Sequence, residues 1–269
     1  MDVAFEQTTL AVLHDCDAVV VGGSFGAVAA AVELARRVSV TLIEPRTYLG
    51  REMTSTLRPW LHVDDPAAAP ELIRSALDAA GVDQGGGNYA FNLDALKIHL
   101  EDVLLTAGVK LLYASLLTGV ETGDGDQRGG VLQGVVIGNK SGRQLIRCRL
   151  LIDATETALA AQITGAILEP VPRGDFPYRR TLEYTNVGAG IDLDAPLIVN
   201  GQVLTLHRGY RDQGHVLVEC PLRLPFAFAD GFALTACETA ARHASMAIAA
   251  ALARDVPAFE SAYLAGASY

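Results

Sequence analysis

The stretch DAVVVGGSFGAVAAAVELARRVSVTLIEPR, residues 17–46, decides the fold of this chain. Residues 18–21 form an all-apolar run, which is typical of a parallel strand that is buried on both faces. A turn of small residues follows, and then an Ala-rich segment over 27–37 predicts a helix. Residues 38–43 predict a second strand. This order of strand, glycine turn, helix and strand predicts a βαβ unit.

The turn and the end of the second strand predict a dinucleotide site. Small side chains over 22–27 allow the backbone to approach a phosphate, and the free N–H groups at the start of a helix attract an anion. Glu44 ends the second strand, where a carboxylate accepts both hydroxyls of a ribose. Aligned with G-x-G-x-x-G, the turn keeps Gly22 and has Ser24 and Ala27 at the other two glycine positions.

Composition and charge exclude several classes of protein. Half of the 269 residues are apolar, which allows a sizeable core. The net charge of −10 and the absence of a basic cluster longer than a pair argue against nucleic acid. Charges interrupt every apolar run before the roughly 20 residues that a membrane helix needs, and the N-terminal residues carry acids where a signal peptide carries Lys or Arg. We expect a cytoplasmic protein without membrane or nucleic-acid partners.

The cysteines predict neither a metal site nor a redox motif. Cys16, Cys148, Cys220 and Cys237 are far apart in the sequence and form no C-x-x-C pair. No His lies near them at a spacing typical of metal ligands. We expect buried free thiols and no metal.

The rest of the chain predicts an α/β protein with a β insertion. A helix over 71–80 follows Pro70, and Asn92 caps another helix that ends at Gly108. Between these helices, residues 84–88 are interpreted as a flexible link. Residues 118–149 predict a β-meander, and residues 150–156 form a buried strand that ends on an acid and a hydroxyl. Such strand ends face the ligand crevice of an α/β sheet.

Five segments follow one another in the chain: GGSFGAVAAA, the strand end at Glu44, the loop LGREMTS, the helix FNLDALKIHLEDVLLTAGVKLLY and the strand LLIDATE. In this order they resemble the FAD-dependent oxidoreductases of the glutathione-reductase-like flavoproteins. The resemblance covers residues 17–167, and the meander before the DAT segment favours FAD over NAD. A later segment over 236–264 resembles a helix of the same family. The family pattern has Gly-Asp after DAT, whereas this chain has Glu156 and Thr157.

The resemblance implies a Rossmann-like FAD-binding domain and a set of cofactor contacts. The pyrophosphate is expected on the glycine turn, the adenosine ribose on the strand-end acid, and the DAT segment close to the FAD. The expected cofactor contacts are Gly22, Gly23, Ser24, Phe25, Gly26, Ala27, Glu44, Pro45, Arg46, Gly50, Arg51, Thr54, Leu117, Asp153, Ala154 and Thr155.

The expected organisation has three parts. Residues 1–167 form the FAD-binding domain, residues 168–235 a β-rich substrate or interface region, and residues 236–269 a C-terminal helix and tail. The flavoproteins that the chain resembles return to the FAD domain with a further closing segment, which is not found after residue 255. We therefore expect a second polypeptide that completes the flavin site, with a truncated, inactive product as the alternative.

The leading functional prediction is an FAD-dependent oxidoreductase that transfers a hydride from a small organic substrate to flavin. The alternatives are a non-catalytic FAD-holding or nucleotide-holding subunit and an NAD-dependent dehydrogenase. His62 and Arg58 are the preferred catalytic candidates, because the loop after the second strand passes near the flavin in the fold that the chain resembles. Weaker candidates are Tyr178, Arg179, His207, Tyr210 and His215.

Overall fold

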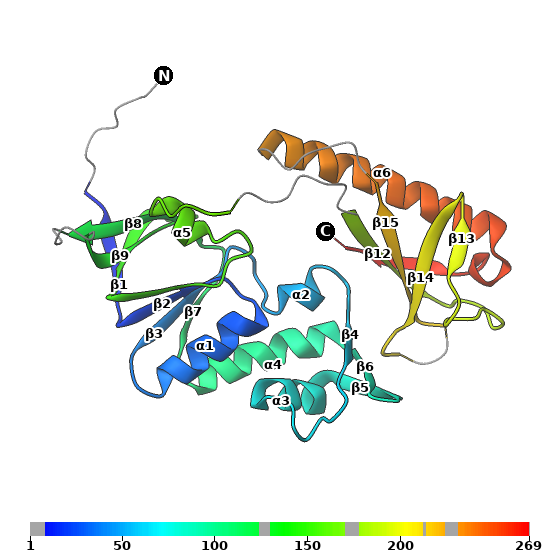
Figure 1. Cartoon of the computed structure of the whole chain (residues 1–269), viewed down its shortest axis with the longest axis horizontal. Coiled ribbons are helices and arrows are strands. Elements are labelled where there is room, and N and C mark those ends of the chain that lie inside the picture. The colour runs from blue at the N-terminus through cyan, green and yellow to red at the C-terminus, as the bar shows by residue number, and fades with distance from the viewer. Residues whose placement is uncertain (1–8, 124–129, 170–177, 212–213, 224–230, 269) are drawn as a thin grey trace. The chain divides into compact units, whose positions relative to one another are not determined.

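The computed structural model describes residues 9–123, 130–169, 178–211, 214–223 and 231–268. The chain divides into two compact units (Figure 1). The first unit contains residues 1–51 and 97–170, and the second unit contains residues 52–96 and 171–269. Residues 52–96 therefore group with the C-terminal part of the chain, whereas the sequence placed them in the first domain. The functional boundaries at 167 and 235 stay predictions.

A parallel sheet in the order β11-β2-β3-β7 forms the centre of the first unit. Its strands are β2 (Ala18–Val21), β3 (Val40–Ile43), β7 (Lys110–Leu112) and β11 (Leu150–Asp153). All residues of β2 and β3 are buried, as their apolar sequences predict. The α-helix α1 (Phe25–Ala35) connects β2 to β3 and packs on both. The βαβ unit and the α/β fold class are confirmed.

The meander forms a second sheet in the first unit, in the order β1-β10-β9-β8. Strands β8 (Leu116–Gly123), β9 (Val131–Asn139) and β10 (Gly142–Arg147) run antiparallel, and residues 124–129 of the predicted meander lie outside the described residues. The lead-in segment supplies β1 (Ala11–Asp15), which pairs with β10 in parallel. Apolar side chains of both sheets share one core.

Three further helices occupy the connections. They are α2 (Arg51–Thr54), α4 (Leu93–Thr106) and α5 (Leu159–Ile163). Asn92 caps α4 as predicted, because its Oδ1 accepts hydrogen bonds from the N–H groups of Asp94 and Ala95 at 3.1 and 3.3 Å. The boundary between the two units falls within α2 and within α4.

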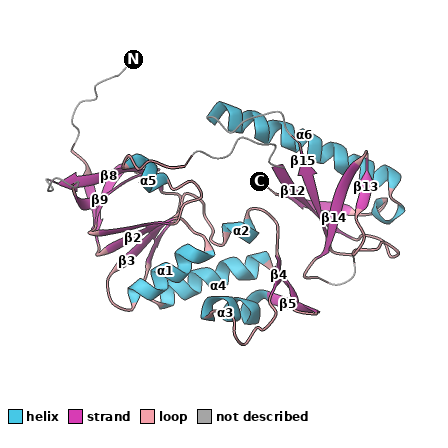
Figure 2. Cartoon of the chain, viewed as in Figure 1, coloured by secondary structure: helices cyan, strands magenta, loops and turns pink. Residues whose placement is uncertain are grey.

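The second unit contains a five-stranded sheet in the order β13-β14-β15-β12-β16. Figure 2 shows the long helix α6 (Gly231–Asp255) along this sheet, followed by the short helix η1 (Pro257–Phe259). The strands are β12 (Tyr178–Thr185), β13 (Leu197–Val199), β14 (Gln202–Arg208), β15 (Val216–Leu222) and β16 (Tyr263–Ala267). Alternate side chains of the central strands pack against α6 in a second apolar core.

A small three-stranded sheet in the order β4-β6-β5 and the helix α3 (Glu71–Ala80) complete the second unit. The strands are β4 (Trp60–His62), β5 (Gly81–Gly85) and β6 (Asn88–Phe91). The prediction of a flexible link over 84–88 is wrong. Three glycines at positive φ, Gly85, Gly86 and Gly87, reverse the chain between β5 and β6, which then pair as a hairpin.

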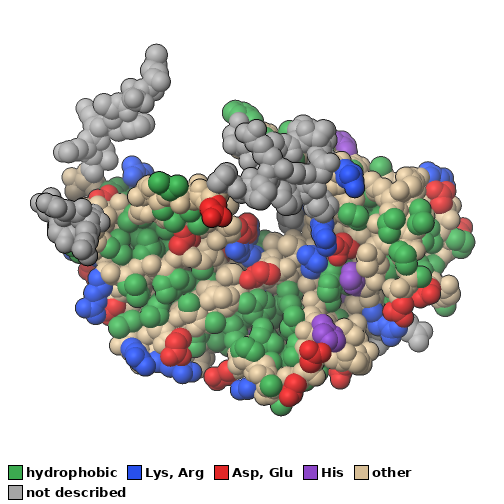
Figure 3. Space-filling model, in the orientation of Figure 1, with side chains coloured by type: hydrophobic (Ala, Val, Ile, Leu, Met, Phe, Trp, Pro, Cys, Tyr) green, Lys and Arg blue, Asp and Glu red, His purple; other side chains and the backbone are tan. Residues whose placement is uncertain are grey.

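Charged side chains of both signs are interspersed on the described part of the face drawn in Figure 3. No helix among the described residues is long and apolar enough to cross a membrane.

Candidate cofactor site

The glycine turn after β2 packs against the ends of both neighbouring strands. The Gly22 N–H donates to the Ile43 carbonyl at 2.8 Å, and the Ala154 N–H donates to the Val21 carbonyl at 2.9 Å. Gly22 has a φ of +110°, and a Cβ at this position would lie 2.5 Å from the Ala154 carbonyl oxygen. Only glycine fits at position 22. The two hydrogen bonds place the turn at the carboxyl ends of β3 and β11.

The helix α1 starts directly at this turn. Ser24 is its N-cap residue, and its Oγ accepts a hydrogen bond from the Ala27 N–H at 3.1 Å. We expected the Ser24 hydroxyl to face a phosphate; the structure gives its oxygen this capping role. Gly26 is exposed, and a Cβ there would meet only the Ser24 Oγ, at 3.7 Å. The first turn of α1 thus has space beside it for a ligand at the positive end of the helix.

Glu44 lies against this turn. Its side chain is buried, and its Oε1 accepts a hydrogen bond from the Arg46 N–H at 2.9 Å. The Arg46 Nη1 lies 3.4 Å from the same oxygen. A Cβ on Gly23 would lie 2.8 Å from the Glu44 Oε2, so the glycine is what allows this carboxylate to reach the turn. The acid and the turn lie together, and binding of a ribose by Glu44 stays a prediction.

Glu156 connects two arginines at this site. Its Oε1 lies 3.3 Å from the Arg46 Nη2 and also pairs with the Arg51 Nη1. In the sequence, Glu156 stands out only as a departure from the family pattern. The structure shows that Arg46 lies between the carboxylates of Glu44 and Glu156. The positive charges of Arg46 and Arg51 therefore offset the negative charges of Glu44 and Glu156 at this edge of the sheet.

Asp153 holds the DAT segment in shape. Its Oδ1 accepts from the Thr155 hydroxyl at 2.6 Å and from the Thr155 N–H at 3.0 Å. Its Oδ2 accepts from the N–H groups of Ala160 and Ala161 at 2.8 and 3.1 Å. Burial opposes ionisation of Asp153, but these hydrogen bonds outweigh it and lower the pKa of the carboxyl. Both carboxylate oxygens are thus engaged within the segment itself.

The other predicted cofactor contacts have different environments. Phe25 and Pro45 are at least partly accessible, whereas Gly50 is buried beside the turn, where its N–H donates to the Gly23 carbonyl at 2.8 Å. The side chain of Leu117 lies in the shared apolar core. Thr54 is buried and belongs to the second unit.

Arg58 belongs to a charged cluster in the second unit, formed around Glu219 of β15. Arg179 Nη1 lies 2.7 Å from the Glu219 Oε1, while the Arg58 Nη2 and the His207 Nε2 lie 3.7 and 3.6 Å from its Oε2. The Trp60 ring stacks on the His207 ring with 3.7 Å between centroids. Only Arg58, Arg179 and His207 were candidates from the sequence, and Glu219, which joins them, was missed.

His62, the other preferred candidate, lies exposed on β4. Its Nδ1 is 3.0 Å from the Asn88 Oδ1, and its Nε2 is 3.0 Å from the Asp64 Oδ1. These two acceptors, Asn88 foremost, raise the pKa of His62. Because an imidazolium has two N–H donors, this arrangement favours the protonated form of His62.

The weaker candidates His215 and Tyr210 pack together. The His215 Nδ1 accepts from the Arg211 N–H at 3.2 Å, and its Nε2 is 2.9 Å from the Glu183 Oε1. Both nitrogens of this buried ring are therefore occupied.

A parallel sheet with a glycine turn, a capped helix and a buried acid at one edge defines a dinucleotide-binding fold. The sequence profile of the FAD dependent oxidoreductase family matches residues 17–170. This match spans more than half of the chain, and the chain belongs to this family. Its cofactor is FAD. Comparison with curated proteins finds no match.

Solved structures with a similar fold include a geranylgeranyl bacteriochlorophyll reductase-like protein from Thermoplasma acidophilum, with a TM-score of 0.61 at 15% identity over 95% of this chain and 65% of that chain. The p-nitrophenol 4-monooxygenase of Pseudomonas putida gives a TM-score of 0.61 at 11% identity over 95% and 67%. The anhydrotetracycline hydroxylase of Streptomyces rimosus gives 0.59 at 12% identity over 94% and 51%. The chain spans about 65% of the length of the first of these proteins.

The residues at the turn suit FAD. Gly22 and Gly23 have no room for a side chain, while the exposed Gly26 leaves open space at the start of α1. A pyrophosphate is compatible with that space, because the first N–H groups of α1 lie at this end of the helix.

Proposed function

We propose that this chain is an oxidoreductase of the glutathione-reductase-like type, in which FAD takes a hydride from a small organic substrate. The single observation that carries the proposal is the contact between the glycine turn and Glu44 at the carboxyl edge of the parallel sheet. Bound FAD supplies the electron-accepting ring, and the protein supplies binding, orientation and polar tuning. In this proposal the turn and α1 hold the pyrophosphate, and Glu44 holds the adenosine ribose.

Replacing Glu44 tests this assignment. Loss of charge-assisted hydrogen bonds to the ribose should cost roughly 1.5–3 kcal/mol, which is about a tenfold to a hundredfold loss of FAD affinity in Glu44→Ala. Titration of the protein with FAD, followed by flavin fluorescence, measures the dissociation constant. Glu33→Ala is the matched control, since Glu33 is an exposed acid of α1 that pairs with Arg36 at 3.0 Å.

Because Glu44 also binds the Arg46 N–H, the Glu44→Ala protein is checked for folding by its thermal midpoint. Glu44→Gln keeps the shape of the side chain and separates loss of charge from loss of packing. Equal FAD affinity in wild type and folded Glu44→Ala protein would remove the ribose assignment.

We further propose that His62 is an acid–base residue of the reaction, with Arg58, shortly before it in the sequence, as a second candidate. The support is the pair of acceptors on the His62 ring, which favours the protonated form.

In His62→Ala, substrate-driven bleaching of the flavin should slow by roughly 10²-fold while FAD stays bound. His14→Ala is the control, and Asp64→Asn should shift the pH profile of the reaction to lower pH because it removes the negative charge beside the His62 ring. An unchanged bleaching rate in His62→Ala would exclude the role.

A non-catalytic subunit is the second candidate function. The engagement of both ring nitrogens of His62 and of His215 favours it, since a general base needs a free nitrogen. Reduction of the bound flavin by a substrate in a single turnover rules this candidate out.

A second polypeptide that completes the flavin site is part of the proposal. Its support is exposed apolar surface in the second unit, on Phe232 and Leu234 of α6 and on Tyr263 of β16. The solution mass of the natively purified, FAD-loaded protein tests it: co-purification of another chain supports the proposal, and a monomer that turns over without a partner contradicts it.

A further inference from the structure

Two cysteines that are distant in the sequence directly follow neighbouring strands of the meander sheet, Cys16 after β1 and Cys148 after β10. The parallel register of β1 and β10 pairs Asp15 with Arg147. The Cys16 N–H continues this ladder by donating to the Arg147 carbonyl at 3.0 Å. The next register position therefore places Cys16 opposite Cys148. All four cysteines are free thiols, as expected, but the fold brings Cys16 and Cys148 next to each other although they are far apart in the sequence.

Both thiols are on the same face of that sheet. Cys148 is buried in the core shared by the two sheets of the first unit, and Cys16 packs against the same core. Neighbouring strands lie about 4.8 Å apart, which is within the Cα separation of about 4.4–6.8 Å that a disulfide requires. The backbone therefore allows a bond between the two sulfur atoms without a change of register.

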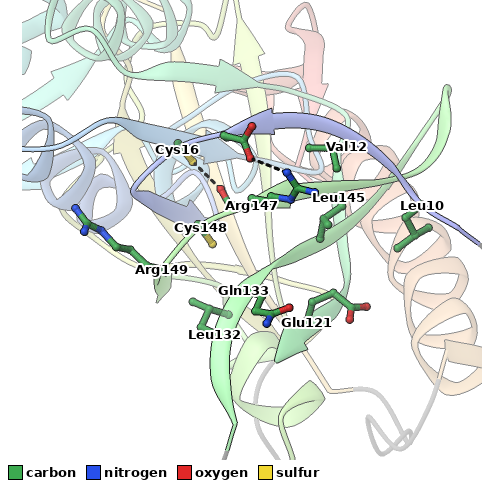
Figure 4. A pocket seen from close by; sticks show the side chains of 11 residues that line it. Leu10, Val12, Cys16, Glu121, Leu132, Gln133, Leu145, Arg147, Cys148 and Arg149 are labelled. Atoms are coloured by element: carbon green, nitrogen blue, oxygen red, sulfur yellow. Dashed lines mark hydrogen bonds and ion pairs between the residues drawn. The ribbon is translucent and has the colours of Figure 1, made fainter. Parts of the chain in front are cut away.

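Solvent has access to this pair. Figure 4 shows Cys16 and Cys148 at a cavity of about 700 Å³ that Gln133, Leu145 and Arg147 also line. Cys16 is partly exposed, whereas Cys148 is buried. A small oxidant that enters the cavity should meet Cys16 first.

We propose that Cys16 and Cys148 form a redox-active pair that hydrogen peroxide converts to a disulfide. The Cys16 sulfur attacks one peroxide oxygen, which gives a sulfenic acid and releases the other oxygen as water. The Cys148 sulfur then displaces the sulfenic hydroxyl as a second water, and the S–S bond forms. Two thiols are oxidised and one peroxide is reduced to two waters. The bond would join the ends of β1 and β10. Its Cys16 end lies just before β2, the strand that leads into the glycine turn.

The surroundings set the pH at which the pair reacts. Burial raises the pKa of the Cys16 thiol and raises that of Cys148 to about 11. The charged groups around the pair are Asp15, Asp17, Glu121, Arg147 and Arg149. Because Arg147 and Arg149 pair with Asp15 and Asp17, these charges largely cancel and burial dominates. Cross-linking should therefore be slow at pH 7 and faster at pH 9.

The test treats the full-length, FAD-loaded protein with hydrogen peroxide and maps its thiols by proteolysis and mass spectrometry without reductant. We expect the loss of two of the four free thiols and a peptide in which Cys16 is linked to Cys148. Cys237→Ser, a buried cysteine of the second unit, is the matched control and should form the same link. Cys148→Ser should stop at a sulfenic acid on Cys16, which a dimedone probe traps.

Two results overturn the proposal. One is complete alkylation of both Cys16 and Cys148 after peroxide treatment of the wild-type protein. The other is oxidation of Cys220 or Cys237 ahead of this pair. Neither result depends on a variant that folds, since both are measured on the wild-type chain.

Discussion

Arg180→Ala should destabilise the second unit by about 3–5 kcal/mol. Arg180 is 1% exposed, and its guanidinium donates to the Glu238 carboxylate on α6 and to the Ser268 carbonyl after β16. A single buried cation thus joins β12 to the helix and to the last strand. Its removal leaves the Ser268 carbonyl without the Arg180 donor and takes the buried cation from the partly buried Glu238 carboxylate, which keeps the Tyr178 hydroxyl as a donor, and it opens a cavity next to the apolar core.

Urea denaturation followed by tryptophan fluorescence measures this effect, because the chain has one tryptophan, Trp60, and it belongs to the second unit. Arg242→Ala is the control. Arg242 lies 3.7 Å from the same Glu238 carboxylate, but its side chain is 63% exposed, so its removal should cost about 0–1 kcal/mol. Equal losses in the two variants would show that Arg180 contributes no more than a surface ion pair.

The parts of the fold that the sequence predicted correctly depend on neighbouring residues. The run over 18–21, the small residues at 22–27 and the acid at Glu44 lie within one βαβ unit, so their order alone determines how they meet. Asn92 caps α4 through N–H groups two and three residues later, which is also a local event. The meander is likewise a set of strands that follow one another in the sequence and pair in that order.

The parts that were missed depend on pairing between distant residues. Nothing near Cys16 predicts that β1 pairs with β10 and brings Cys148 next to it. In the sequence, Arg180 and Glu219 resemble the charged, solvent-facing residues of a strand. In the structure both are buried, and each pairs with a distant residue: Arg180 with Glu238 of α6, and Glu219 with Arg58. The glycine run over 85–87 has the composition of a linker, and only the pairing of β5 with β6 makes it a turn.

In the candidate cofactor site too, contacts between residues close in the sequence were predicted and contacts between distant residues were missed. The turn and Glu44 were found from spacing, because strand, turn and helix are consecutive. The ion pairs of Glu156 with Arg46 and Arg51 join segments that approach only when β11 pairs with β2 beside β3. A carboxylate at a position where the family pattern has glycine was the available signal, and it suggested a lost contact rather than a new one.

Acidification should weaken the second unit through Glu219. This carboxylate is 7% exposed, and its pKa is lowered from 4.5 to about 2. The His207 N–H is the foremost cause, and the charges of Arg58 and Arg179 add to it and outweigh burial. Because the folded pKa lies below the unfolded one, the unfolded chain takes up the proton first as the pH falls. The stabilisation is therefore complete above pH 4.5 and is lost as the pH approaches 2.

The difference in free energy of unfolding between wild type and Glu219→Gln measures this contribution. A shift of this size corresponds to about 3 kcal/mol, so the difference should be largest at pH 7 and shrink steadily below pH 4.5. Trp60 again reports the transition, since its ring stacks on His207 within the same cluster. In Asp255→Asn, where the lost carboxylate is exposed beside Arg254, the difference from wild type should stay small. A Glu219→Gln difference that does not change with pH would mean that Glu219 is held by packing and not by its charge.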